Sequence, residues 1–194
     1  MKKLTAILLV LAMLLAFAAC TGSKDDTTTE NKSEPAGPAS ALALLEEVWK
    51  TYAEDEKFAA AGGDGTEENS RSDAPGKFGI SDAETLDSML GFPKDSVALI
   101  DDAASLMHMM NQNTFTCGAY HVANSSDVDA LAAKLKDNIL ARRWMCGFPE
   151  KLVIVAVGDY VLSYFGNGET VDLFTTKLTA VYSDARQISD TPIE

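Results

Sequence analysis

The most distinctive chemistry of the sequence lies in a sulfur- and imidazole-rich segment near its middle. Residues 107–110 read Met-His-Met-Met, and Cys117 and His121 follow closely. Thioether, imidazole and thiolate ligands together suit a soft ion such as Cu(I). Methionine is also an adaptable filler of hydrophobic cores, and neighbouring residues of a strand point to opposite faces of a sheet. We therefore expect core packing here, with no metal and no cofactor, and soft-metal or small-ligand binding is the alternative function.

A cysteine near the N-terminus carries the signal of lipid modification. Two lysines precede an apolar run over residues 4–17, and small residues at positions 18 and 19 precede Cys20. This order is typical of a signal peptide, here residues 1–19, whose removal leaves Cys20 as the lipid-bearing N-terminus. The apolar run is shorter than the roughly 20 residues of a membrane-spanning helix. We expect an extracytoplasmic protein that is anchored to the cell membrane by lipidated Cys20, and a plain secretory signal is the alternative.

Two further cysteines, Cys117 and Cys146, remain once Cys20 is assigned to the lipid. An extracytoplasmic compartment permits disulfide bonds, and a bridge between these two residues would stabilise the fold by about 3 to 4 kcal/mol in the chain-entropy model. Two buried free thiols, which pack as small apolar residues, are the alternative. The sequence does not place the two Cα atoms within bridging distance, so both alternatives stay open.

The familiar residue patterns of enzymes are missing from the sequence. His108 and His121 are its only histidines, and it contains no G-x-S-x-G, S-x-x-K or H-E-x-x-H sequence that would bring a nucleophile or a metal to a base. Paired carboxylates stay open in so acidic a chain, yet the sequence singles out no pair. We predict no catalytic residue and expect that the protein is not an enzyme.

The charge of the chain argues against nucleic acid as a partner. The 16 Lys and Arg residues are outnumbered by 29 Asp and Glu residues, which gives a net charge of −13. Nucleic-acid binding depends on a basic surface that neutralises phosphates, whereas the cations of this chain are scattered. We expect a membrane contact through the lipid anchor, together with a protein or cell-envelope partner.

Composition and hydropathy divide the chain into a signal peptide, a tether, a domain and a tail. Residues 20–40 are rich in Thr, Ser, Lys and Asp and almost free of apolar residues, so burial cannot offset their ordering entropy and we expect a disordered tether. Residues 41–183 have the length and patterning of a single α+β domain. Residues 184–194 lose all periodicity, which predicts a loose tail.

Periodicity within the domain predicts its helices and strands. Apolar residues at helical spacing indicate helices over residues 41–52, 81–90, 126–143 and 171–181, with Ser40 and Ser81 as caps of the first two. Short apolar runs indicate strands over residues 97–100, 104–110, 114–122, 152–157 and 160–165. Gly158-Asp159 favours a two-residue hairpin turn, and the acidic, glycine-rich residues 53–75 favour a mobile loop without a calcium site.

Two echoes in the sequence indicate an internal duplication. Gly-Phe-Pro occurs at residues 91–93 and 147–149, and Val-Asp followed by Lys-Leu occurs at residues 128–135 and 171–178. Two duplicated strand-strand-helix units would pair their strands into one antiparallel sheet with helices packed on one face. The opposite face would then be open for a partner. Convergent turn and helix chemistry is the alternative explanation of the echoes.

Several of these features together resemble a known group of proteins. They are the cysteine that ends the signal, the Thr/Ser/Asp-rich tether, the helix over residues 127–143 that ends in arginine, and the hairpin Val155-Ala156-Val157-Gly158-Asp159-Tyr160-Val161. From residue 90 to residue 181 the order of elements is similar to an uncharacterised family of small bacterial lipoproteins, defined as a domain of unknown function. The resemblance implies a tethered α+β domain and carries over no catalytic residue.

The sequence therefore predicts a non-catalytic binding or accessory module of the cell envelope. Its anchor would hold it at the membrane, its acidic charge would keep it in solution, and one face of the sheet would bind the partner. The sequence does not identify that partner.

Overall fold

The computed structural model describes residues 37–145 and 147–193, so Cys20, the signal peptide and most of the predicted tether lie outside the described residues. The helices are α1 (Ala41–Trp49), α2 (Ala83–Leu90), α3 (Val128–Leu140) and α4 (Gly168–Val181), with 3-10 helices η1 (Lys94–Leu99) and η2 (Ser125–Asp127). The strands are β1 (Ala60–Gly62), β2 (Arg71–Ser72), β3 (Gly76–Lys77), β4 (Ile100–His108), β5 (Phe115–Val122), β6 (Lys151–Val157), β7 (Tyr160–Gly166) and β8 (Arg186–Pro192). Within the described residues, no helix combines the length and apolarity that crossing a membrane requires.

All strands belong to one antiparallel sheet, which confirms the predicted α+β fold. The strand order is β2-β1-β4-β5-β7-β6-β8, and β3 pairs with β4 beside β1. The predicted hairpin is also confirmed, because Gly158 and Asp159 join β6 to β7, and Val157 pairs with Tyr160. Gly158 has a φ of 54°, a conformation that a two-residue hairpin turn requires and glycine adopts readily.

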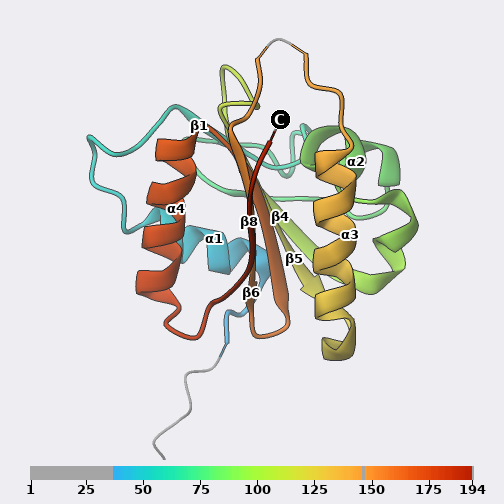
Figure 1. Cartoon of the computed structure of the whole chain (residues 1–194). Helices are drawn as coiled ribbons and strands as arrows, with labels where there is room; N and C mark the ends of the chain where they lie inside the picture. The colour runs from blue at the N-terminus through green and yellow to red at the C-terminus, as the bar shows by residue number, and fades with distance from the viewer. Residues whose placement is uncertain (1–36, 146, 194) are drawn as a thin grey trace, which may run out of the picture. The chain divides into compact units, whose positions relative to one another are not determined.

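The helices cover both faces of the sheet, so the prediction of helices on one face is wrong. Helices α1 and α4 pack on the face that carries Leu106, Cys117 and Tyr164. Helices α2 and α3 pack on the opposite face, against Tyr120 and Phe165 among others. Figure 1 shows the sheet between these two helical layers. In the part of the chain that the structure describes, helices therefore cover the sheet face that the sequence suggested for a partner.

The chain path explains why the helices separate onto two faces. Helix α3 connects β5 to β6 across β7, and α4 connects β7 to β8 across β6. The strands joined by each helix are parallel, because each is antiparallel to the strand between them. Both connections move in the same direction across the sheet, yet β5 and β7 run in opposite directions. Crossovers of one hand, the strong preference of such connections, must then place the two helices on opposite faces.

Each half of the domain does follow the order strand, strand, helix. The first unit is β4, β5 and α3, the second is β6, β7 and α4, and the pairing of β5 with β7 joins them. The repeated valine and leucine of the helices, Val128 with Leu135 and Val171 with Leu178, are all buried. The units therefore use equivalent helix positions for packing, while the origin by duplication stays a prediction.

Local hydrogen bonds adjust several predicted boundaries. Ser40 caps α1 as predicted, but α2 is capped by Asp82 instead of Ser81, because the Asp82 carboxylate accepts hydrogen bonds from two first-turn amides. The segment predicted as a strand over residues 97–100 is mostly the 3-10 helix η1, and β4 starts at Ile100, so it includes residues 101–103, which precede the predicted strand over residues 104–110. The Asp102 side chain accepts a hydrogen bond from the Ala41 amide at 2.8 Å.

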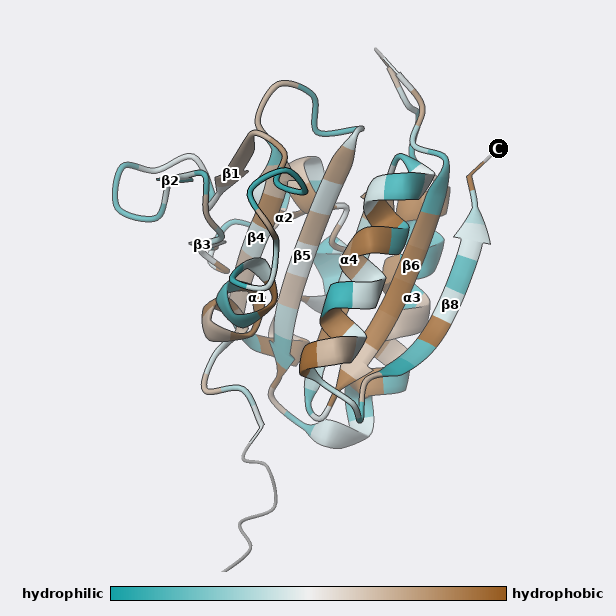
Figure 2. Cartoon of the chain, turned by 90° about the vertical axis from the view of Figure 1, so that its left-hand side faces the viewer, coloured by the Kyte–Doolittle hydropathy of each residue, from teal (hydrophilic) through white to brown (hydrophobic). Residues whose placement is uncertain are grey.

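The C-terminal segment corrects the prediction of a loose tail over residues 184–194. Residues 186–192 form β8, which pairs with β6 along its length, and Figure 2 shows β8 at an edge of the sheet. Several of its side chains are exposed, so backbone pairing with β6 holds it, with Ile188 packed against the core. Hydropathy periodicity does not detect such a strand.

The acidic segment over residues 53–75, predicted as a mobile loop, contains β1 and β2 and is organised around Asp64. The Asp64 carboxylate accepts hydrogen bonds from the side chains of Thr66 and Asn69, both at 2.6 Å, and from the Gly79 amide at 3.0 Å. Burial alone would raise the pKa of Asp64, but the hydrogen bonds from Thr66, Asn69 and Gly79 outweigh it and lower the pKa to about 2. The ionised carboxylate therefore stabilises the folded segment.

We expect Asp64→Asn to reduce the free energy of unfolding at pH 7 by about 1 to 2 kcal/mol, because the shifted carboxylate stabilises the fold only when ionised. The stabilisation is complete above the pKa of the unfolded chain, near 4, and is lost as the pH falls through the folded pKa of about 2. Urea unfolding at pH 7, 4 and 3 should therefore show the difference between wild type and variant shrinking with acidity. Asp55→Asn, at an exposed position, is the control, and a difference that stays constant with pH would contradict the assignment.

Candidate functional site

Exposed apolar side chains gather in two loops of the described chain. Met109, Met110, Met145 and Phe148 are 54%, 77%, 77% and 75% exposed, respectively. The first two lie between β4 and β5, in residues 109–114, and the others lie between α3 and β6, in residues 141–145 and 147–150. We call these two loops the tip. Large apolar side chains in contact with water are a recognised mark of an interaction surface when they cluster.

Hydrogen bonds tie the two loops of the tip together. The Asn113 side-chain amide donates to the backbone carbonyls of Met145 and Gly147, both at 3.0 Å. The Asn113 backbone amide is in turn held by the Asn111 side chain at 3.0 Å. One side chain of the β4–β5 turn thus bridges to the backbone of the other loop, so the two loops that carry the exposed apolar side chains lie next to each other.

The tip carries little charge in an otherwise acidic protein. Residues 103–126 contain no Asp, Glu, Lys or Arg, and the charged residues of the other loop are Arg142, Arg143 and Glu150. Arg142 is engaged internally, because its guanidinium donates to the carbonyls of Asp87 and Ser88 at 3.2 and 2.8 Å and lies over the Trp144 ring. An apolar partner can therefore approach this end of the sheet without displacing a dense array of hydrated charges.

The described chain begins at the other end of the sheet. There Tyr160 donates a hydrogen bond from its hydroxyl to the Pro38 carbonyl at 3.0 Å, beside the β6–β7 turn. Tyr160 pairs with His121, whereas Gly166 at the far end of β7 pairs with Phe115 beside the tip. These two ends of β5 are about 20 Å apart at the rise of an extended strand. Figure 1 shows the start of the described chain at the bottom and the tip loops at the top.

The structure does not bring the predicted soft-metal ligands together. The His108 ring stacks on Phe58 with centroids 5.7 Å apart, and its Nδ1 atom accepts backbone hydrogen bonds at 3.3 Å. His121 lies at the opposite end of the sheet, with its Nδ1 atom 2.5 Å from an Asp101 carboxylate oxygen. Met107 is buried in the α2–α3 face of the core. Within residues 37–145 and 147–193, no group of three or more His, Cys, Asp or Glu side chains is placed to hold a metal ion.

Cys117 packs in the core as a free thiol. It is fully buried on the α1–α4 face of the sheet, and burial raises the pKa of its thiol well above the ordinary value. A buried thiol of this kind behaves as a small apolar residue and stays protonated. The two alternatives for the cysteine pair were a disulfide and two buried free thiols. Cys117 is a buried free thiol, while Cys146 lies outside the described residues.

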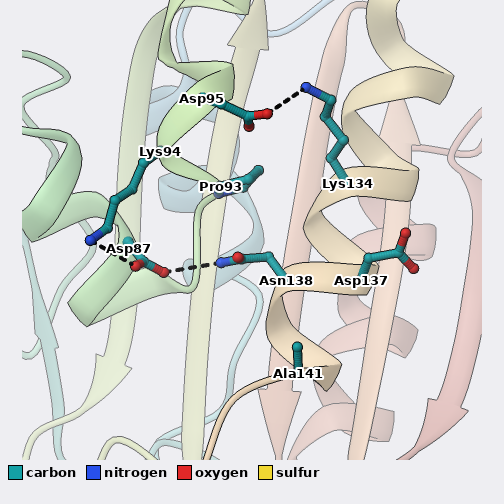
Figure 3. A pocket seen from close by; sticks show the side chains of 8 residues that line it. All are labelled: Asp87, Pro93, Lys94, Asp95, Lys134, Asp137, Asn138 and Ala141. Atoms are coloured by element: carbon teal, nitrogen blue, oxygen red, sulfur yellow. Dashed lines mark hydrogen bonds and ion pairs between the residues drawn. The ribbon is translucent and has the colours of Figure 1, made fainter.

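A shallow groove of about 510 Å³ runs between α2, η1 and α3, and among its charged residues Asp87, Lys94, Asp95 and Lys134 already form ion pairs. The Lys94 ammonium lies 3.5 Å from an Asp87 carboxylate oxygen, and the Lys134 ammonium lies 3.2 Å from Asp95. Asn138 donates a hydrogen bond to Asp87 at 3.0 Å. Figure 3 shows these contacts crossing the groove, with Asp137 directed away from Asp87. The groove thus links α2 and η1 to α3, and its polar groups are used for packing.

The sequence singled out the methionines of residues 107–110 but did not show that Met109 and Met110, together with Met145 and Phe148, are exposed. The repeated Gly-Phe-Pro motif shows why, since Phe92 is fully buried and Phe148 is 75% exposed. Identical local sequences therefore lie in opposite environments. The sequence offered one further indication of this surface, which is the absence of charged residues from positions 103–126. Both an interaction loop and a buried strand can lack charged residues, so this feature does not distinguish between them.

We expect Asn113→Ala to loosen the tip without unfolding the domain. Loss of the hydrogen bonds to Met145 and Gly147 should cost less than about 1.5 kcal/mol of global stability, because both loops are solvent accessible. Amide hydrogen exchange of residues 141–150 should accelerate, since local opening no longer breaks these bonds. Gln112→Ala, an exposed neighbour in the same turn, should leave exchange unchanged. Equal exchange in the two variants would show that Asn113 does not hold the loops together.

Comparison with known proteins assigns no family or function to this chain. No protein-family model, no curated protein and no solved structure matches it. The resemblance to an uncharacterised family of small bacterial lipoproteins therefore stays a prediction.

Proposed function

We propose that this protein is a membrane-tethered, extracytoplasmic lipoprotein that works as a non-catalytic binding module of the cell envelope. Cys20 would carry the lipid, residues 20–40 would form the tether, and the tip would bind the partner. The observation that supports this proposal best is the clustering of Met109, Met110, Met145 and Phe148 in solvent at one end of the sheet. The resemblance to small bacterial lipoproteins supports the anchor.

Burial of the tip against a partner would supply a substantial driving force. Removing one large apolar side chain from water contributes about 1.5 to 3 kcal/mol before the costs of association are subtracted. Methionine is flexible and polarisable, so it can adapt to a partner surface without a rigid pocket. Phe148 adds an aromatic side chain, a type enriched at protein interfaces. The composition of the tip therefore favours a protein surface as its target.

The position of the tip suits a tethered protein. The described chain starts near Pro38, which contacts Tyr160 at one end of the sheet, and the tip lies at the other end. A lipid attached at Cys20 would hold the first end nearer to the membrane and leave the tip free to meet a partner. This arrangement replaces the sheet-face surface expected from the sequence, which helices cover on both sides.

We expect Cys20→Ala to move the protein from the membrane fraction to the soluble fraction, because the thiol that carries the lipid is removed. Fractionation and immunoblotting of cells that express the wild type or the variant measures the shift. Cys146→Ala, which leaves the predicted lipid site intact, should remain with the membranes. Retention of the Cys20 variant in the membrane fraction would overturn the proposed anchor.

The binding role of the tip is tested by site-specific photocrosslinking in intact cells. A photoreactive residue at position 110 or 148 should give a discrete adduct with a partner, while the same residue at Asp159, an exposed position at the opposite end, should give none. Met110→Glu and Met145→Glu, introduced together with the probe at position 148, should reduce the adduct about tenfold or more, because carboxylates in an apolar contact are costly to desolvate. Melting temperatures should be unchanged, since both methionines are largely exposed. Equal adducts at positions 110 and 159, or an adduct insensitive to the two glutamates, would contradict the proposal.

A further inference from the structure

The tip concentrates the exposed thioether sulfur of the described chain. Met109, Met110 and Met145 are 54%, 77% and 77% exposed, while Met107, two residues before the first of them, is only 5% exposed. The difference follows from the end of β4 at His108, since Met107 still belongs to the strand and points into the α2–α3 core. Closely spaced methionines of one chain therefore meet opposite environments.

We propose that Met109, Met110 and Met145 form an oxidation site that switches the tip from an apolar to a polar surface. The oxidant would be a hydroperoxide, for which hydrogen peroxide is the probe. A lone pair of the thioether sulfur attacks one peroxide oxygen, an S–O bond forms and the O–O bond breaks. The departing hydroxide takes up the remaining peroxide proton and leaves as water. Sulfur loses two electrons, peroxide gains two, and the product is methionine sulfoxide.

Because these methionines lie in exposed loops, their oxidation can change the surface of the tip without damaging the fold. Oxidation of a buried methionine places a polar sulfoxide in the core, which would apply to Met107. The tip methionines lie in loops outside the strands and helices, so their sulfoxides can stay in water. Cys117, which is fully buried, is shielded from the same oxidant. Peroxide should therefore change the surface of the tip first and leave the core intact.

The consequence for a partner rests on the proposed function of the tip. An apolar contact made by three thioethers would become a contact with three polar S–O groups, whose desolvation opposes binding. Methionine sulfoxide is also reducible by sulfoxide reductases, so the change is reversible. The change in surface polarity itself does not depend on whether a partner exists.

The first test is a hydrogen peroxide time course on the purified full chain, followed by peptide mass spectrometry. Met110 and Met145 should oxidise about tenfold faster than Met107, because susceptibility follows exposure. In urea the rates should become equal, which shows that folding protects Met107. Emission of a dye that binds apolar surfaces should fall as the tip oxidises, while circular dichroism stays constant. Equal rates in the folded chain, or unchanged dye emission after oxidation of all three residues, would overturn the proposal.

Matched variants separate oxidation from other effects of peroxide. Replacement of Met109, Met110 and Met145 by leucine keeps the tip apolar but removes the thioethers, so dye emission should stay high and become insensitive to peroxide. Replacement by glutamine imitates the polar sulfoxide and should lower the emission without peroxide. A leucine variant that still responds to peroxide would place the effect elsewhere in the chain and refute the assignment.

The photocrosslinking assay distinguishes failure of this proposal from failure of the proposed function. With the probe at position 148, peroxide should reduce the adduct of the wild type and not that of the leucine variant. An adduct that survives complete oxidation would refute the switch and leave the binding role standing. Selective oxidation and loss of dye emission without any adduct before peroxide would support the oxidation site and refute the binding role.

Discussion

The pairing of β5 with β7 is the interaction on which the rest of the structure depends. It runs from Phe115 with Gly166 to His121 with Tyr160 and joins the part of the sheet formed by β1 to β5 to the part formed by β6, β7 and β8. A sheet of three or more strands that packs against helices has the independent stability that a two-stranded hairpin lacks. The central strands are almost entirely buried, because the joined sheet has a helical layer on each side.

This central pairing also determines where function can reside. Both sheet faces are occupied by helices, so neither is available to a ligand or partner. Chemically distinctive side chains such as Cys117 and Met107 are buried in the core. The loops at the ends of the strands are left as the accessible surface, a common location for binding residues on a rigid scaffold.

The two ends of the sheet differ in chemical character. At one end lies Pro38, close to the start of the described chain. Its surroundings include Asp159 and the pair formed by His121 and Asp101. At the other end the tip, whose charged residues are Arg142, Arg143 and Glu150, exposes three methionines and a phenylalanine. A domain anchored near its charged end would present its apolar end to a partner. The same exposure would make the tip accessible to oxidants, so the proposed binding surface and the proposed oxidation site coincide.

The sequence by itself determined the class of the fold and most of its elements, because periodicity reports which side chains each element buries. It predicted the hairpin at Gly158-Asp159 and the strand-strand-helix order of both halves, since turn residues and apolar stripes are local signals. Only the tertiary structure decided that α3 and α4 lie on opposite faces, because that depends on the direction of β5 relative to β7 and on the hand of each crossover. The pairing of β8 with β6 likewise depends on backbone hydrogen bonds that leave little hydropathy pattern. The exposed surface of the tip could not be predicted from local sequence either, because exposure depends on tertiary packing. Phe92 and Phe148 belong to the same Gly-Phe-Pro motif, yet Phe92 is buried and Phe148 is exposed.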